Sequence, residues 1–198
     1  MKTLSLFLLN DKEIEISNEI EKIIYKKESF LADLKNAQGK YILFVKNYEH
    51  TSEDYISKVL DKTKEEFMKV LEVNLVGTFL ITKYTCLKMD KGTIINISSL
   101  DSTKTFNSLS TDYIASKAGV NTLTKTFSLE YKDIRFITLL LPWIKTSSVL
   151  EMNPIYLKEE MEKYGQYRLM GVDEVSKKII EVINSSVPTG SIIEVNYD

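Results

Sequence analysis

Hydrophobic and polar residues alternate along the chain in blocks that predict strands separated by helices. Short apolar runs rich in branched and aromatic side chains are typical of buried strands. The predicted strands are Thr3–Leu9, a short exposed Glu13–Ile16, Tyr41–Lys46, Thr93–Ser98, Ile134–Leu141 and Thr189–Val195. Buried strands that alternate with helices form mostly parallel sheets with a helix layer on each side. The pattern therefore predicts an α/β fold of three layers.

Helical periodicity fills the stretches between these strands. Ser17 or Asn18 can cap a helix that runs to about Ala37 with its apolar residues on one stripe, and Gly39 ends it. Thr63–Glu66 has the capping-box pattern, in which a threonine and a glutamate three residues later satisfy the first backbone amides of a helix. Further helices are predicted in a short stretch through Leu60 and over 63–89, 112–131, 155–164 and 171–186.

Length and composition limit the class of protein. A chain of 198 residues is typical of one domain, 1–198, and 43% apolar with 27% charged residues is the balance of a soluble globular protein. A formal net charge of −2 supplies no basic field, so we expect no nucleic-acid partner. The longest apolar run, Phe136–Leu141, is far too short to span a bilayer, so we expect no membrane partner.

Cysteine and histidine are too few for several kinds of site. Cys86 is the only cysteine, which excludes an intramolecular disulfide, and a reducing, cytoplasmic location is expected. Because His50 is the only histidine, we expect no metal centre of nitrogen and sulfur ligands. Met1–Leu9 is apolar like a signal peptide, but Asn10–Glu13 follows it in place of a small-residue cleavage site. We therefore interpret the opening run as a buried strand.

Candidate chemistry gathers between Asn96 and Lys117. Tyr113 and Lys117 are four residues apart at the start of a predicted helix, which places a phenol and an ammonium on one face. A nearby cation favours the phenolate and lowers the pKa of a tyrosine from its usual value of about 10. Ser99 ends the preceding strand and can hold a substrate oxygen beside the tyrosine. Together these groups suit proton transfer to or from an alcohol or carbonyl oxygen.

The same residues resemble the short-chain dehydrogenase/reductase family. Asn96–Ser99 matches the family's Asn-x-Ser-Ser strand end, and Tyr113–Val120 matches its Tyr-x-x-x-Lys helix. Asn74 aligns with the family's fourth catalytic position, which holds a water that links the lysine to solvent. The resemblance runs from about Thr63 to Val195 and ends in a Thr-Gly strand like that of the family.

This resemblance implies a Rossmann-like, doubly wound sheet and a reaction that uses NAD or NADP. Tyr113 would be the general acid, and Lys117 would lower its pKa and hold the nicotinamide ribose. Ser99 would orient the carbonyl group, and Asn74 would support a proton relay. The cofactor-binding residues that the resemblance implies are Asn47, Lys117, Pro142 and Thr146.

The N-terminal part, 1–60, departs from the family pattern, whereas 63–195 forms a family-like core. The family's first strand leads into a glycine-rich turn that lets the backbone approach the cofactor pyrophosphate, but the first glycine here is Gly39. Only Asn47 matches the family's Asn-Asn-Ala-Gly segment, and Trp143 stands where a glycine usually follows the proline. We therefore expect a sheet with a reduced N-terminal edge. We also expect dinucleotide binding no tighter than about millimolar.

Three functions remain open at this point. The first is an oxidoreductase that interconverts a small-molecule carbonyl and an alcohol with NAD(P). The second is a non-catalytic relative that acts as a binding or assembly module, and the third is a cofactor-free acid/base enzyme that uses Tyr113 and Lys117. The resemblance also implies a homo-oligomer, a dimer through helices 63–89 and 112–131. Apolar residues in surplus for such an interface are Phe67, Leu71, Leu75, Phe79, Leu123 and Phe127.

Overall fold

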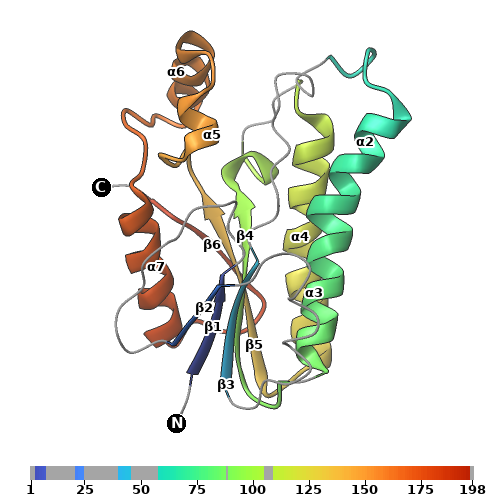
Figure 1. Cartoon of the computed structure of the whole chain (residues 1–198), viewed down its shortest axis with the longest axis vertical. Coiled ribbons are helices and arrows are strands. Elements are labelled where there is room, and N and C mark those ends of the chain that lie inside the picture. Colours follow the sequence, from blue (N-terminus) through green and yellow to red (C-terminus); the bar gives the residue numbers. More distant parts are fainter. Residues whose placement is uncertain are drawn as a thin grey trace.

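The computed structural model describes residues 3–7, 21–24, 40–45, 58–87, 89–104 and 109–196, and they form one parallel sheet with helices on both faces (Figure 1). The strands are β1 Thr3–Phe7, β2 Glu21–Ile24, β3 Lys40–Val45, β4 Gly92–Ser99, β5 Ile134–Leu141 and β6 Ser191–Glu194. Their order is β2-β1-β3-β4-β5-β6, and every pair is parallel. The strand order reverses between β1 and β3. Open α/β sheets bind ligands at such a point, beyond the C-terminal ends of the strands.

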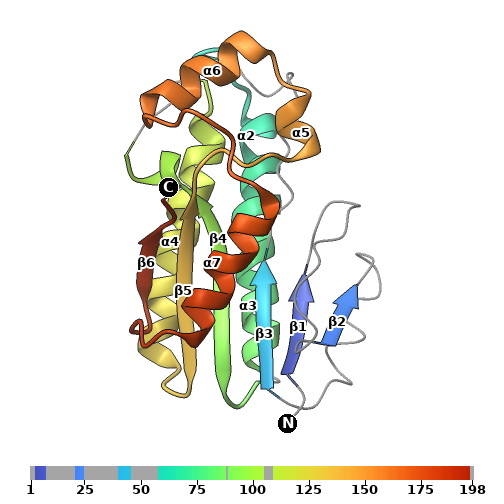
Figure 2. The same cartoon turned by 90° about the vertical axis from the view of Figure 1, so that its left-hand side faces the viewer.

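The helices make the two outer layers. The main ones are α2 Lys64–Leu71, α3 Gly77–Cys86, α4 Thr111–Glu130, α5 Ser147–Leu150, α6 Pro154–Lys163 and α7 Val172–Asn184. Figure 2 shows α7 covering one face of the sheet, while α3 and α4 lie behind the other face. In Figure 1, α5 and α6 lie beyond the C-terminal ends of β4 and β5. No helix within the described ranges is long and apolar enough to cross a membrane.

The core lies on both faces of β4 and β5. The residues of β5 are buried at all positions except Arg135, as expected for a central parallel strand with a helix layer on each side. On the α7 side, a buried cluster consists of Ile95, Ile137, Leu139, Leu141, Met170, Val175, Ile179 and Val195. On the α4 side, the rings of Phe127 and Phe136 stack with centroids 5.6 Å apart. The cluster on the α7 side includes Leu139 and Leu141 at the C-terminal end of β5, whereas the aromatic pair on the α4 side packs near the start of β5.

The helix before β4 changes its winding at its centre. Thr63 caps α2 and forms the predicted capping box with Glu66. The π-helical segment η2, Glu72–Val76, then joins α2 to α3. A β-carbon at Gly119 would lie 2.7 Å from Cδ1 of Leu75, so this glycine lets α4 approach the π segment closely. Asn74, the candidate on this helix, lies within the π segment, a feature that is frequent at functional sites.

The predicted α/β fold of three layers is confirmed, as are most elements after residue 62. The bounds of β5 match the prediction, and α4, α6 and α7 each agree within two residues. One prediction is wrong: Glu21–Ile24, assigned to a helix over 17–37, forms the strand β2, because these residues pair with Leu4–Phe7 of β1. A helix through Leu60 is also wrong at its end, since 59–61 is a turn.

Several other predictions fall on residues outside the described ranges. The predicted strand Glu13–Ile16 is one of them, and Asn47 is another. Before β3 the structure describes the strands β1 and β2, and the reduced N-terminal edge stays a prediction. Of the apolar residues predicted to be in surplus, Phe127 is buried within the subunit, where it packs against Phe136 of β5, and the dimer stays a prediction.

Candidate active site

Tyr113 and Lys117 lie one turn apart in the first half of α4. The Nζ atom of Lys117 lies 5.5 Å from the centroid of the Tyr113 ring, within the range of a cation–π contact. It also donates to the backbone oxygen of Ile97 on β4, at 3.3 Å. Only 1% of Lys117 is exposed. The fold therefore holds a buried ammonium group against the face of the tyrosine.

Ser99 is the last residue of β4, and its Cα pairs in register with Leu141, the last residue of β5. Its Oγ atom accepts the backbone N–H of Asp101 at 3.2 Å, which caps the short 3-10 helix η3, Leu100–Ser102. The same hydroxyl donates to Oδ2 of Asp101 at 3.3 Å. Ser99 is thus held at the C-terminal edge of the sheet, where the prediction placed it.

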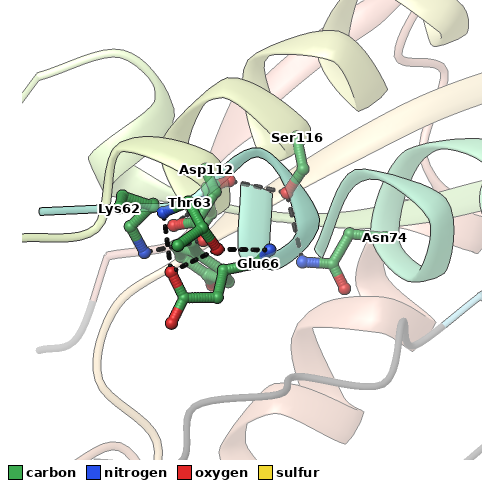
Figure 3. Close-up of polar contacts among 7 residues, drawn as sticks. Lys62, Thr63, Glu66, Asn74, Asp112 and Ser116 are labelled. Atoms are coloured by element: carbon green, nitrogen blue, oxygen red, sulfur yellow. Dashed lines mark hydrogen bonds and ion pairs between the residues drawn. The ribbon is translucent and has the colours of Figure 1, made fainter. Parts of the chain in front are cut away.

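Asn74 connects to the backbone of Tyr113 through Ser116, and Figure 3 shows the contact between Asn74 and Ser116. Its Nδ2 atom donates to Oγ of Ser116 at 3.1 Å, and Ser116 donates to the backbone oxygen of Tyr113 at 2.6 Å. The backbone oxygen of Asn74 accepts the hydroxyl of Thr78 at 2.6 Å. Its side-chain Oδ1 is buried and has no partner among the described residues. A buried oxygen of this kind is a suitable place for an ordered water.

The segment after β5 carries Pro142, Trp143 and Thr146. Pro142 is buried and directly follows the register partner of Ser99. The backbone of Trp143 is fixed on both sides by Gln166, whose amide accepts from the Trp143 nitrogen at 3.0 Å and donates to the Trp143 oxygen at 2.8 Å. Thr146 precedes α5, with its hydroxyl 3.3 Å from that of Ser148. The backbone that follows the proline is therefore held rigidly.

Two acidic residues near the site escaped the sequence analysis. Asp112 forms a buried ion pair with Lys62, drawn in Figure 3, and also accepts the backbone N–H of Tyr113 at 2.9 Å. Asp101 accepts from Ser99 and from the hydroxyl of Tyr164. Their partners lie 50 and 63 residues away in the sequence, so no local pattern links them. The sequence offered one indication of their importance: Asp112 directly precedes Tyr113, and Asp101 follows Ser99 by two residues.

A groove with a volume of about 560 Å³ lies along α6 and is separate from these residues. Its lining is mostly apolar and includes Leu157, Met161, Tyr167 and Leu169. None of its lining residues is a predicted catalytic or cofactor-binding residue. Gln166 lines the groove and also holds the backbone of Trp143.

Comparison with known proteins defines the class. Residues 54–156, just over half of the chain, match the family model of the short chain dehydrogenases. The chain therefore belongs to the short chain dehydrogenase family. It is 32% identical over 147 residues to the (3R)-3-hydroxyacyl-CoA dehydrogenase of Mus musculus, a match that covers 70% of this chain and 56% of that protein. It is 30% identical over 128 residues to the 7alpha-hydroxysteroid dehydrogenase of Clostridium sardiniense, with 62% and 48% covered. The chain thus spans about half the length of these curated relatives.

Solved structures show the same fold. The aldohexose dehydrogenase of Thermoplasma acidophilum superposes with a TM-score of 0.70 at 21% identity, covering 85% of this chain and 71% of that one. A 3-oxoacyl-(acyl-carrier protein) reductase from Brucella melitensis with bound NAD gives a TM-score of 0.72 at 22% identity, covering 85% and 65%. At this level of identity the likeness concerns the fold.

The two ends of a nicotinamide dinucleotide fit this chain unequally. The buried ammonium of Lys117, beside Tyr113 and near the end of β4, suits the nicotinamide ribose. The chain has no glycine between β1 and Gly39, so the backbone cradle that receives a pyrophosphate in this fold is missing from the sequence. Within the described ranges, no group of histidine, cysteine, aspartate and glutamate could hold a metal ion. The sequence between β1 and Gly39 therefore lacks the glycines of the usual pyrophosphate turn.

Proposed function

We propose that this chain is an oxidoreductase that interconverts a carbonyl and an alcohol in a small molecule. The observation that carries the proposal is the buried Lys117 ammonium, 5.5 Å from the ring centroid of Tyr113 in the first half of α4. A positive charge held against a tyrosine favours the phenolate and thus eases transfer of the phenolic proton. Membership of the short chain dehydrogenase family supports the same reaction class.

In the reduction direction, Tyr113 donates its phenolic proton to the carbonyl oxygen of the substrate. Lys117 stabilises the phenolate that remains, and Ser99 gives a hydrogen bond to the same substrate oxygen. Asn74 holds a water at its buried Oδ1, through which the site regains a proton. NAD or NADP, when bound, supplies or accepts the hydride. Pro142, Thr146 and Lys117 are the residues we assign to its nicotinamide end, and Asn47 is assigned from the family pattern alone.

The cofactor should bind weakly, because the pyrophosphate loses several hydrogen bonds worth about 1.5–3 kcal/mol each. We expect a Kd of about millimolar or above for both NADH and NADPH, with about −4 kcal/mol of net affinity. Trp143 is the only tryptophan and directly follows Pro142, so its fluorescence reports on the segment that we assign to the nicotinamide end. Quenching should approach saturation only at millimolar dinucleotide. A micromolar midpoint would instead show that another part of the chain replaces the glycine turn.

The substrate can be sought among the compounds that the relatives' names indicate. Those names point to 3-hydroxyacyl thioesters and to hydroxysteroids. Acetoacetyl-coenzyme A and a 7-oxosteroid are therefore suitable first probes, each with millimolar NADH or NADPH, and loss of absorbance of the reduced nicotinamide measures turnover. Substrate-dependent oxidation of NADH or NADPH supports the proposal, and its absence with a broad panel of carbonyls would contradict it.

A second function, as an assembly module, is favoured by the outer surface of α2, η2 and α3. Six apolar side chains on this surface are 39–64% exposed: Met68, Val76, Phe79, Leu80, Tyr84 and Leu87. Exposed apolar side chains gathered on one run of helix are typical of a protein–protein interface. We propose that it forms a symmetric dimer with a second copy, either alongside catalysis or in place of it. A reducing, cytoplasmic compartment suits both functions, because the lone Cys86 is a buried free thiol.

A further inference from the structure

The carboxylate of Asp101 contacts two residues that are far apart in the sequence. Its Oδ2 atom accepts the hydroxyl of Ser99 at 3.3 Å, and its Oδ1 atom accepts the hydroxyl of Tyr164. Tyr164 is the residue that follows the last turn of α6. One side chain in the loop after β4 therefore joins the end of the sheet to the end of α6, which Figure 1 shows beyond the strands.

The backbone alone does not require this carboxylate. The short helix η3 is already capped when the Ser99 oxygen accepts the backbone N–H of Asp101, at 3.2 Å. Any residue other than proline at position 101 would supply that N–H group. The carboxylate adds a second interaction, which fixes the direction of the Ser99 O–H bond because a serine hydroxyl has only one proton to donate. It adds a third by accepting from Tyr164.

We propose that Asp101 is a positioning residue of the site: its carboxylate orients the Ser99 hydroxyl and fastens α6 above it through Tyr164. This proposal rests on the function proposed above, in which Ser99 gives a hydrogen bond to the substrate oxygen. While Ser99 donates to Asp101, it offers a substrate only a lone pair. An alcohol can donate to that lone pair, whereas a carbonyl must first draw the Ser99 proton away from Asp101. Asp101 therefore favours binding of the alcohol over the carbonyl.

Two substitutions separate the two contacts of Asp101. Asp101→Asn keeps an oxygen that can accept from Tyr164 but places an N–H group toward Ser99, which releases the serine proton. Tyr164→Phe keeps the contact between Asp101 and Ser99 but removes the one to α6. Tyr167→Phe is a matched control, since Tyr167 lies three residues further on and is 73% exposed.

Hydrogen exchange of the α6 amides tests the fastening without any need for turnover. A hydrogen bond to a charged group should slow local opening by about tenfold or more. Tyr164→Phe should therefore speed exchange over Pro154–Lys163 by about tenfold or more. Asp101→Asn offers Tyr164 a neutral acceptor in place of a charged one, so it should also speed exchange, by a smaller factor, while Tyr167→Phe leaves the rate near that of the wild type. Unchanged exchange in Tyr164→Phe would overturn this half of the proposal, even if the protein proves to be an active oxidoreductase.

Steady-state kinetics test the orientation of Ser99. Asp101→Asn should lower the KM for a carbonyl and raise the KM for the corresponding alcohol, with compensating changes in kcat because the overall equilibrium is fixed by the reactants. If Asp101 only stabilised the fold, Asp101→Asn would change the KM values for the carbonyl and the alcohol in the same direction. That result would overturn the proposal that Asp101 orients the Ser99 hydroxyl. If no carbonyl or alcohol is turned over at all, the proposed function fails, whereas the exchange result still decides whether Asp101 holds α6.

Discussion

The ammonium nitrogen of Lys62 lies 2.8 Å from a carboxylate oxygen of Asp112, and only 3% of each side chain is exposed. This pair ties the turn before α2 to the first turn of α4, next to Tyr113. Removing one partner leaves an uncompensated buried charge, which typically costs about 3–5 kcal/mol. We expect Lys62→Met to lower the free energy of unfolding by about that amount, as measured by urea denaturation.

The matched control is a double variant, Lys62→Met with Asp112→Asn, which removes both charges of the ion pair. Asp112→Asn keeps an oxygen that can accept the backbone N–H of Tyr113, so the double variant with Lys62→Met loses the pair but not this contact. The double variant should recover most of the stability lost by Lys62→Met, because no unpaired charge remains. Additive losses in the double variant would show that the pair itself is not the source of the effect.

Two glycines with positive φ should differ in their tolerance of alanine. Gly165 has φ 65° and an open surrounding, so Gly165→Ala should cost about 1–2 kcal/mol of backbone strain. Gly190 has φ 81°, and a β-carbon there would lie 2.6 Å from Oγ of Ser128, which donates to the backbone oxygen of Lys125. Gly190→Ala should therefore lower the free energy of unfolding by more than Gly165→Ala does. Adding Ser128→Ala removes the close contact, so it should restore only the part of the loss that exceeds the backbone strain. Equal costs for the two alanine variants, measured by denaturation, would contradict this.

The ion pair between Arg168 and Glu174 gives a prediction for pH. Hydrogen bonds from the Arg168 guanidinium and from the backbone N–H of Gly171 lower the pKa of Glu174 from 4.5 to about 2. A carboxyl with a lowered folded-state pKa contributes stability above its unfolded pKa and loses it as the pH falls toward the folded one. The difference in Tm between the wild type and Glu174→Gln should be full above pH 4.5 and should close between pH 4.5 and 2. Arg168→Gln should show the same closing gap, and a gap independent of pH would refute the assignment.

The exposed apolar surface of η2 and α3 predicts a dimer that single charges can break. Val76, Phe79 and Leu80 are 45%, 39% and 40% exposed on neighbouring turns. Val76→Glu should convert the dimer to a monomer in light scattering, because an unpaired charge at the centre of an apolar interface is costly. Ile155→Glu on α6, where the side chain is 69% exposed, is the control and should leave the dimer intact. A wild-type protein that stays monomeric at high concentration would contradict the prediction.

Sequence patterns predicted the elements that are fixed by local chemistry. The unbroken apolar run of β5 and the capping box at Thr63 both determine their element from neighbouring residues alone. The strand β2 escaped prediction because Glu21–Ile24 has a pattern compatible with a helix, and only its pairing with β1 makes it a strand. The π segment was equally invisible, since it occurs where Leu75 packs against Gly119 of another helix.

Some features of the candidate site could be predicted from local sequence, and others could not. The spacing of Tyr113 and Lys117 predicted one helix face, and the ammonium does lie against the ring. Nothing in the sequence could predict that Ser116 would connect Asn74 to the backbone of Tyr113, or that Tyr164 would reach Asp101. These contacts join elements that meet only in the folded chain. The assignment of catalytic roles to these residues therefore stays a prediction that experiment must test.

The most direct test of the proposed chemistry is the rate of carbonyl reduction by Tyr113→Phe, compared with the wild type at millimolar NADH or NADPH. This change removes one hydroxyl oxygen and keeps the ring that faces Lys117. A general acid contributes typically about 10²–10⁴-fold to the rate, so kcat should fall by about that factor while thermal stability stays near the wild-type value. Equal rates for Tyr113→Phe and the wild type would contradict the assignment of Tyr113 as the proton donor and with it the central claim.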